Sequence, residues 1–202
     1  MESSNPVPRL ILASASPRRR ELLQKAGITF AVVPSNTSEA VQLGESPQEY
    51  ALRVAGEKAR DVGRNHAGAW ILSADTIVEI DGEILGKPQD EADGGRMLRL
   101  LSGRTHRVMT AFVLLGERGQ LHMQQIVTSQ VSFKPLSDTQ IRDYLATGEP
   151  LDKAGAYAVQ GFGAALVERV EGSYTNVVGL PMDEVLAALH TAGLLSHQKT
   201  DK

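Results

Sequence analysis

The feature that most constrains the fold of this chain is the alternation of short apolar, strand-like runs with helical segments that begin at capping residues. Residues 9–13 and 29–33 are rich in apolar, β-branched and aromatic side chains, which predicts two strands. Between them, Ser16 and Pro17 mark the start of a helix, and Gly27 marks its end. This order of strand, helix and strand is typical of an α/β protein.

Hairpin signals within the alternation predict that the sheet is mixed. Asp81 and Gly82 separate two apolar runs, which is the pattern of a tight β-hairpin. Ser46 and Glu49 form a capping box that predicts the start of a long helix. Further elements are expected as strands at residues 70–72, 76–80, 83–85, 105–115, 122–133 and 164–170, and as helices at residues 47–62, 90–101 and 138–147 and from residue 183. We therefore predict an α/β fold with a mixed, twisted sheet flanked by helices.

Chain organisation and composition exclude several classes of protein. The 202 residues contain no linker-like tract or internal repeat, so we expect one domain over residues 9–195, with flexible tails at residues 1–8 and 196–202. No apolar run approaches the roughly 20 residues of a membrane-spanning helix, so no membrane partner is expected. The absence of cysteine excludes disulfides and thiolate chemistry and fits a cytoplasmic location. A formal net charge of -3 argues against a general nucleic-acid binder.

The first candidate site is the segment at residues 14–20, SASPRRR, where a predicted strand leads into a helix N-terminus. Free backbone N–H groups and the positive end of the helix dipole favour an anion there. The two serine hydroxyls of this segment and up to three guanidinium groups, those of Arg18, Arg19 and Arg20, add donors that match phosphate oxygens, although the spacing is not that of a P-loop. The alternative interpretation is a helix cap followed by a solvated basic face, with Arg20 pointing to solvent.

Carboxylates that suit a metal ion or a general base lie in two places. Asp75 is expected at the end of a buried strand, where a charge is costly unless it is paired, hydrogen-bonded or metal-bound. It is therefore a candidate metal ligand or general base, or else a turn aspartate that bonds its own backbone. Glu39 lies in a polar loop after the second strand and either supplies a second carboxylate or is simply solvated.

Three further residues have both a functional and a structural interpretation. Lys58 lies on a predicted helix close to acidic residues, so an exposed, ion-paired helix face is the default expectation. Lys87 follows a strand, a position at which α/β folds place ligand contacts. In the glycine-rich stretch at residues 153–163, Gln160 can donate and accept hydrogen bonds at the edge of a planar base, or point to water from a structural turn.

Several ordered motifs, taken together, resemble those of the Maf-like nucleotide pyrophosphatases. The matching stretches are SASPRRRELL (14–23), RVAGEKA (53–59), SADTIVEIDGEILGKP (73–88), LSGRTHRVMT (101–110), ATGEPLDKAGAYAVQG (146–161) and GSYTNVVGLP (172–181). Within that family, the KAGAYAVQG form resembles the branch that acts on dTTP and UTP, whereas a sister branch prefers 7-methyl-GTP and carries a different sequence there.

This resemblance implies a fold akin to the inosine triphosphatases, with two lobes around a cleft, and a homodimer. It implies hydrolysis of pyrimidine nucleoside triphosphates to the monophosphate and pyrophosphate with a divalent cation, Mg²⁺ or Mn²⁺. The matched positions are Asp75 as the catalytic proton acceptor and a metal ligand, Glu39 as a second metal ligand, Arg18, Thr76 and Gln160 as determinants of substrate preference, and Ser14, Arg19, Lys58 and Lys87 as phosphate-binding residues.

The leading functional hypothesis is a housekeeping enzyme that removes pyrimidine triphosphates, modified ones included, before they enter nucleic acid. One alternative is a nucleotide-binding regulator linked to cell division, in which hydrolysis is incidental. Another is the branch of the family directed at 7-methyl-GTP. A nucleic-acid-binding protein that uses the basic residues 18–20 is a further alternative, which the acidic charge balance of the chain opposes.

Overall fold

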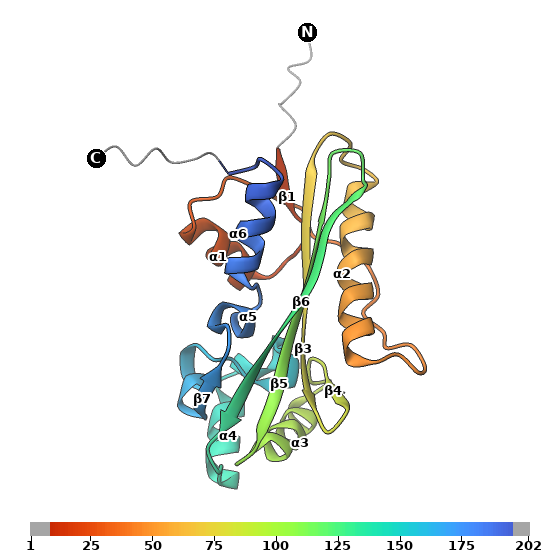
Figure 1. Cartoon of the computed structure of the whole chain (residues 1–202). Coiled ribbons are helices and arrows are strands. Elements are labelled where there is room, and N and C mark those ends of the chain that lie inside the picture. Colours follow the sequence, from red (N-terminus) through yellow and green to blue (C-terminus); the bar gives the residue numbers. More distant parts are fainter. Residues whose placement is uncertain (1–8, 196–202) are drawn as a thin grey trace, which may run out of the picture.

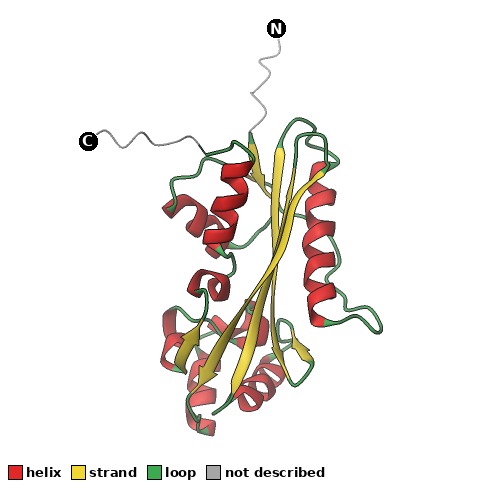
Figure 2. Cartoon of the chain, viewed as in Figure 1, coloured by secondary structure: helices red, strands yellow, loops and turns green. Residues whose placement is uncertain are grey.

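A long central sheet runs through the molecule, with helices on both sides of it (Figures 1 and 2). The computed structural model describes residues 9–195, so the tails expected at residues 1–8 and 196–202 lie outside the described residues. In chain order the elements are β1 (Leu10–Leu12), α1 (Pro17–Lys25), β2 (Ala31–Val32), α2 (Pro47–Gly63), β3 (Trp70–Ile80), β4 (Glu83–Leu85), α3 (Glu91–Leu101), β5 (Thr105–Leu115), β6 (Leu121–Phe133), α4 (Asp138–Ala146), the 3₁₀ helices η1 (Glu149–Asp152), η2 (Ala154–Ala156) and η3 (Gly161–Ala165), β7 (Val167–Glu171), α5 (Tyr174–Val178) and α6 (Met182–Thr191).

The sheet is mixed, as predicted. Its 7 strands follow the order β2-β1-β3-β5-β6-β7, with β4 paired to β3. The first strand, β1, is parallel to both β2 and β3, whereas the other strand pairs are antiparallel. The long strands β3, β5 and β6 form a twisted spine on which the helices pack (Figure 2). The predicted α/β class, a mixed and twisted sheet flanked by helices, is confirmed.

Helices cover the two faces of the sheet differently (Figure 1). Along one face lies α2, which buries the residues predicted to face inward, namely Ala51, Val54, Ala55, Ala59 and Val62. On the other side, α1 and α6 lie near β1, α5 packs against β5 and β6, and α3 and α4 lie toward the opposite end of the long strands. The start of α1, the middle of β3 and residues of the segment 152–160 between η1 and η3 line one cavity.

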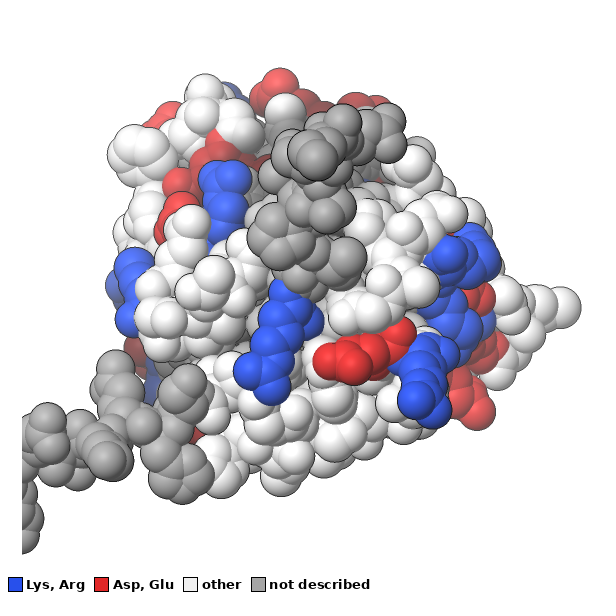
Figure 3. Space-filling view, turned by 90° about the horizontal axis from the view of Figure 1, so that it is seen from above, with Lys and Arg blue, Asp and Glu red and all other residues white. Residues whose placement is uncertain are grey.

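Two general properties of the described residues are the length of the helices and the distribution of surface charge. Among the described residues, no helix is long and apolar enough to cross a membrane. At the end of the molecule seen in Figure 3, basic and acidic side chains are interspersed among uncharged ones.

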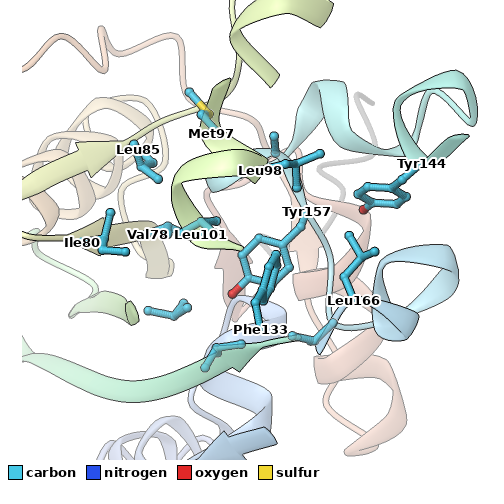
Figure 4. Packing of buried hydrophobic residues seen from close by; sticks show 14 of the residues in the cluster. Val78, Ile80, Leu85, Met97, Leu98, Leu101, Phe133, Tyr144, Tyr157 and Leu166 are labelled. Atoms are coloured by element: carbon cyan, nitrogen blue, oxygen red, sulfur yellow. The ribbon is translucent and has the colours of Figure 1, made fainter. Parts of the chain in front are cut away.

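The core beneath α3 and α4 holds an aromatic cluster (Figure 4). Phe133 and Tyr157 pack edge to face with ring centroids 4.7 Å apart, and both lie against His106. The Nε2 atom of His106 lies 2.6 Å from the hydroxyl oxygen of Tyr157. Burial lowers the pKa of His106 to about 4, so the ring is neutral near pH 7. Through Tyr157, this cluster anchors the irregular segment between η2 and η3.

One continuous strand, β3, replaces the two strands predicted at residues 70–72 and 76–80. The polar stretch between them is expected from the sequence to break the strand, but neighbouring elements satisfy its side chains. Ser73 is buried and donates a hydrogen bond of 2.6 Å to the carbonyl oxygen of Ala55 in α2. Asp75 pairs in register with Ala111 of β5. The expectation that Asp75 ends a strand is therefore wrong, because it lies inside one.

Smaller differences occur where elements are short. The strand predicted at residues 29–33 is reduced to Ala31–Val32, and the strand predicted from residue 164 begins at Val167, after η3. The helix α5 is absent from the prediction, because 5 residues are too few to show a helical period. Its N-cap is Ser173, whose hydroxyl oxygen accepts a hydrogen bond of 3.2 Å from the backbone N–H of Asn176.

Candidate active site

A cavity of about 370 Å³ opens beside the middle of β3. It is bounded by the junction of β1 and α1, by the inward face of α2, by the end of β4 and by the segment between η1 and η3. All the residues predicted to form a site line this one cavity: Ser14, Arg18, Arg19, Glu39, Lys58, Asp75, Thr76, Lys87 and Gln160. The fold thus brings together residues that lie far apart in the sequence.

Asp75, Lys58 and Glu39 form a connected group of charged side chains in the cavity. The Lys58 ammonium, from α2, donates a hydrogen bond of 2.7 Å to Asp75 Oδ1 and lies 2.6 Å from Glu39 Oε1. Asp75 and Lys58 are 6% and 8% exposed, so their charges compensate each other away from water. The expectation that Lys58 lies on an exposed helix face is therefore wrong, because α2 turns this position toward β3.

Two residues of α2 hold the loop that carries Glu39. The Tyr50 hydroxyl donates a hydrogen bond of 2.8 Å to the backbone carbonyl of Glu39. The Arg53 guanidinium donates one of 3.0 Å to the carbonyl of Ala40 and forms an ion pair of 2.6 Å with Glu45. Neither Tyr50 nor Arg53 is predicted as a functional residue, since each holds the Glu39 loop through a backbone carbonyl, an acceptor that sequence does not distinguish.

The carboxylate of Glu39 is partly open to solvent, with 42% of its side chain exposed. Partial burial raises its pKa, but the hydrogen bond and the charge of Lys58 lower it more, with help from Lys87 and Arg19. The pKa of Glu39 therefore lies below its ordinary value, and the group is ionised near pH 7. Lys87 is more exposed and lies 4.0 Å from Glu39 Oε2.

Arg19 is buried and joins three parts of the cavity wall. Its Nε donates to the carbonyl oxygen of Gly179 at 2.8 Å, and its two terminal nitrogens donate to Ser14 Oγ at 3.1 Å and to Thr76 Oγ1 at 3.0 Å. Thr76 Oγ1 also lies 2.9 Å from Thr110 Oγ1 on β5. Burial lowers the pKa of Arg19, yet a guanidinium stays protonated at any physiological pH. Ser14, Arg19 and Thr76 therefore form one connected polar network.

Arg18 and Gln160 differ from this network because their side chains are uncommitted. Neither side chain forms a hydrogen bond or an ion pair with another residue in the range 9–195. Arg18 is half-buried and follows the capping residue Ser16, whereas Gln160 is exposed. Both side chains are therefore available to a ligand in the cavity, while Arg20 is exposed and does not line the cavity.

The residues of the cavity that suit a metal ion are Asp75 and Glu39. Their carboxylates converge on the same ammonium of Lys58, so both reach one region of space. Within residues 9–195 there is no cluster of three or more His, Cys, Asp or Glu side chains that forms a complete protein cage. Two carboxylates nevertheless fit the coordination habit of Mg²⁺, which is usually bound by one or two carboxylates together with substrate phosphates.

Comparison with known proteins gives consistent matches over nearly the whole chain. Residues 9–192 match the family model described as Maf-like protein. The chain is 52% identical over 188 residues to a dTTP/UTP pyrophosphatase of Geobacter sulfurreducens, which covers 93% of this chain and 98% of that protein. It is also 52% identical over 188 residues to a dTTP/UTP pyrophosphatase of Anaeromyxobacter dehalogenans, covering 92% and 95%. Among solved structures, a nucleoside-triphosphatase / dITP/XTP pyrophosphatase from Mycobacterium abscessus aligns with a TM-score of 0.42 and 19% identity, covering 92% of this chain and 97% of that one.

Proposed function

This chain belongs to the family of Maf-like proteins, and from that membership we propose that it hydrolyses dTTP and UTP to the monophosphate and pyrophosphate. Two relatives that share 52% of their residues with it carry the name dTTP/UTP pyrophosphatase. The single structural observation that carries the proposal is the grouping of Asp75, Lys58 and Glu39 beside the N-terminus of α1 in one cavity.

The cavity supplies the positive charge that a triphosphate requires. The N-terminus of α1 favours an anion through its dipole and its first-turn N–H groups. Arg18 and Lys87 are available there to bind phosphate oxygens, because neither is committed to a close internal ion pair. Arg19 and Lys58 are buried and already bonded, so they act mainly as fixed positive charge.

Asp75 is the group best placed to activate water. Its carboxylate is buried at the cavity wall and is oriented by the hydrogen bond from Lys58. We assign it the role of accepting a proton from a water that attacks the α-phosphorus, with pyrophosphate as the leaving group. A divalent cation held by Asp75 and Glu39 would neutralise charge on the phosphate oxygens. The protein groups then orient the water and the nucleotide.

Gln160 is proposed to recognise the base. Its carboxamide can accept a hydrogen bond from N3–H of thymine or uracil and donate one to a ring carbonyl. Cytosine presents the reverse pattern, which the same carboxamide would satisfy if it were flipped. Preference for dTTP and UTP over CTP therefore requires that the orientation of Gln160 be fixed. Arg18 and Thr76 line the same cavity and are the other proposed determinants of substrate preference.

The biological setting proposed for this activity is the removal of pyrimidine triphosphates, modified ones included, before they enter nucleic acid. We assign it to the cytoplasm, which the absence of cysteine supports. We also expect a homodimer, on the basis of the family resemblance alone. The regulator hypothesis is less well supported, because a protein that only binds nucleotides has no need of a buried carboxylate oriented toward the cavity by a lysine.

Product analysis tests the proposal directly. Purified protein is incubated with Mg²⁺ or Mn²⁺ and dTTP, UTP, CTP, GTP or 7-methyl-GTP, and the products are separated by anion-exchange chromatography. We expect pyrophosphate and the monophosphate from dTTP and UTP. Turnover confined to 7-methyl-GTP would keep the reaction but overturn the assignment of the base. Nucleotide binding without turnover, in protein shown to be folded, would favour the regulator.

A further inference from the structure

Glu149 lies at the start of η1 and is surrounded by hydrogen-bond donors from the segment that carries Gln160. Its Oε1 accepts hydrogen bonds from the Tyr144 hydroxyl at 2.8 Å and from the Gly163 N–H at 2.9 Å. Its Oε2 accepts one of 3.0 Å from the Phe162 N–H. A single carboxylate thus binds two successive backbone N–H groups just after Gln160.

Tyr144 extends this arrangement to the residues before Gln160. Its hydroxyl donates to Glu149 and accepts a hydrogen bond of 3.2 Å from the Ala158 N–H. A second tyrosine, Tyr174 of α5, donates one of 3.3 Å to the carbonyl oxygen of Val159. The backbone is therefore held on both sides of residue 160 by side chains from α4, η1 and α5.

Two glycines allow the segment to pack this closely against the carboxylate. Gly161 has a φ of 69°, and a Cβ there would lie 2.4 Å from Glu149 Oε2. A Cβ on Gly163 would lie 2.3 Å from the carbonyl oxygen of Ala158 and 2.6 Å from the Tyr144 hydroxyl. Any larger residue would push the segment away from Glu149 and Tyr144. Both glycines are therefore explained by the presence of this hydrogen-bonded group.

The side chain of Gln160 forms no hydrogen bond with another residue in the described range. Its place at the cavity wall is therefore set by the backbone on either side of it. Glu149 and Tyr144 are not among the described residues that line the cavity. They therefore act on a bound nucleotide only indirectly. Burial raises the pKa of Glu149, but the hydrogen bonds from Gly163, Tyr144 and Phe162 lower it more, so the carboxylate is ionised near pH 7.

We propose that Glu149, together with Tyr144, is a positioning residue that sets base selectivity by holding the backbone around Gln160. This inference rests on the proposed function, in which Gln160 recognises the base. When the segment is held, the carboxamide of Gln160 meets the base in one orientation. When the backbone around residue 160 is no longer held, the carboxamide of Gln160 can flip by about 180° and pair with cytosine, so the preference for UTP over CTP falls.

The main test is Glu149→Gln, which keeps the shape but places an N–H₂ group against a backbone N–H. We expect the ratio of kcat/KM for UTP to that for CTP to fall about tenfold, mainly through a higher KM for UTP, because a mispositioned hydrogen-bond partner loses discrimination. The kcat for UTP should change by no more than about threefold, since Glu149 does not touch the reacting groups. Glu168→Gln, an exposed glutamate on β7, is the matched control and should leave the ratio unchanged.

A double-mutant cycle shows whether Glu149 acts through Gln160. In a Gln160→Ala background, Glu149→Gln should have no further effect on the UTP to CTP ratio. An equal effect in both backgrounds would overturn the inference. Should Glu149→Gln fail to fold, Tyr144→Phe removes only the hydroxyl between Glu149 and Ala158 and should lower the ratio in the same direction; an unchanged ratio there overturns the inference too.

These measurements separate a failure of the proposed function from a failure of the role assigned to Glu149. If the wild-type protein has no preference for UTP over CTP, or no turnover at all, the proposed function is wrong. If the wild-type protein prefers UTP and folded Glu149→Gln keeps that preference, only the role assigned to Glu149 is wrong. Circular dichroism and thermal unfolding of each variant establish that the protein is folded.

Discussion

Asp75 sits inside an 11-residue strand, whereas Gln160 sits between 3₁₀ helices of 3 and 5 residues. We call the surroundings of Asp75 the phosphate side of the cavity, formed by Ser14, Arg19, Glu39, Lys58 and Asp75. We call residues 149–163 the base side. On the phosphate side, α1, α2 and β3 supply Arg19, Lys58 and Asp75, whereas Ser14 and Glu39 come from loops. On the base side, hydrogen bonds from backbone N–H groups to the side chains of Tyr144 and Glu149 take the place of the backbone hydrogen bonds of a regular strand or helix.

This difference indicates what each side can tolerate. On the phosphate side Arg19, Lys58 and Asp75 are buried and hydrogen-bonded, so removing one partner leaves a buried polar or charged group without compensation. The base side contains left-handed residues at Gly155, Ala156 and Gly161 and presents an exposed glutamine. Changes there should alter which nucleotide is accepted before they abolish the reaction. The predictions below test that contrast, beginning with the largest effect.

The largest effect is expected from Asp75→Asn. The carboxamide keeps the volume and can still accept the hydrogen bond from Lys58, but it cannot take a proton from water. We expect kcat for dTTP to fall by about 10²- to 10⁴-fold, the usual contribution of a general base. Pyrophosphate release measures the rate, and Asp183→Asn, at an exposed position in α6, is the control. A folded Asp75→Asn protein with nearly normal kcat would show that the phosphate side is misassigned.

Lys58→Met tests whether the ammonium compensates the buried carboxylates. Methionine has a similar length but no charge, so Asp75 loses its 2.7 Å partner. The free energy of unfolding should fall by about 3 kcal/mol, the cost of breaking a buried ion pair. Urea denaturation with and without Mg²⁺ provides the measurement.

The same experiment sharpens the proposal for the metal. Added Mg²⁺ should restore part of the stability of Lys58→Met, because a cation can then neutralise Asp75 and Glu39. Lys25→Met, at an exposed position in the last turn of α1, should behave like the wild type. If Mg²⁺ stabilises Lys58→Met no more than the wild type, the two carboxylates do not share a cation.

Gly155→Ala addresses the backbone of the base side. Gly155 has a φ of 69°, and a Cβ there would lie 2.9 Å from Cγ2 of Val78. We expect the free energy of unfolding to fall by about 2–3 kcal/mol from the combined cost of a left-handed alanine and of crowding. Gly119 also has a positive φ, of 75°, but a Cβ there would have no neighbouring atom within 4 Å. The free energy of unfolding of Gly119→Ala should therefore fall by only about 1 kcal/mol. Equal losses in thermal or urea unfolding would show that the close approach to Val78 is unimportant.

The smallest effect concerns the pH dependence of stability. Hydrogen bonds place the pKa of Glu149 below its ordinary value of 4.5 in the folded protein. A carboxyl with a lowered folded pKa stabilises fully above its unfolded pKa and loses that contribution as pH falls through the folded pKa. The stability difference between the wild type and Glu149→Gln should therefore be constant near pH 7 and shrink below pH 4.5. Urea titrations of the wild type and of Glu149→Gln across this pH range provide the measurement.

The sequence predicts best those elements whose signals are local. The capping box of Ser46 and Glu49 is present, and so is the hairpin turn at Asp81 and Gly82. The break predicted around Asp75 is wrong because the partners that satisfy Ser73 and Asp75 come from α2, which no local pattern shows. The wrong expectation of an exposed face for Lys58 has the same cause.

The candidate site was predictable as a set of residues, since the motifs that resemble the family contain all of them except Glu39. What the sequence does not show is how they are held. Tyr50, Arg53, Glu149 and Tyr144 each hold a loop through at least one hydrogen bond to a main-chain atom, and such a bond leaves no signature in the partner residue. The glycines at 161 and 163 are the one local signal of close packing.

Isotope labelling tests most directly whether water activated by Asp75 attacks the α-phosphorus. Hydrolysis of dTTP in ¹⁸O-labelled water, followed by mass spectrometry of both products, locates the oxygen that enters. We predict that the label appears in dTMP and that pyrophosphate remains unlabelled. Label in pyrophosphate would place the attack on the β-phosphorus, and labelled orthophosphate with dTDP would place it on the γ-phosphorus. Either result would contradict the role assigned to Asp75 and the phosphate side.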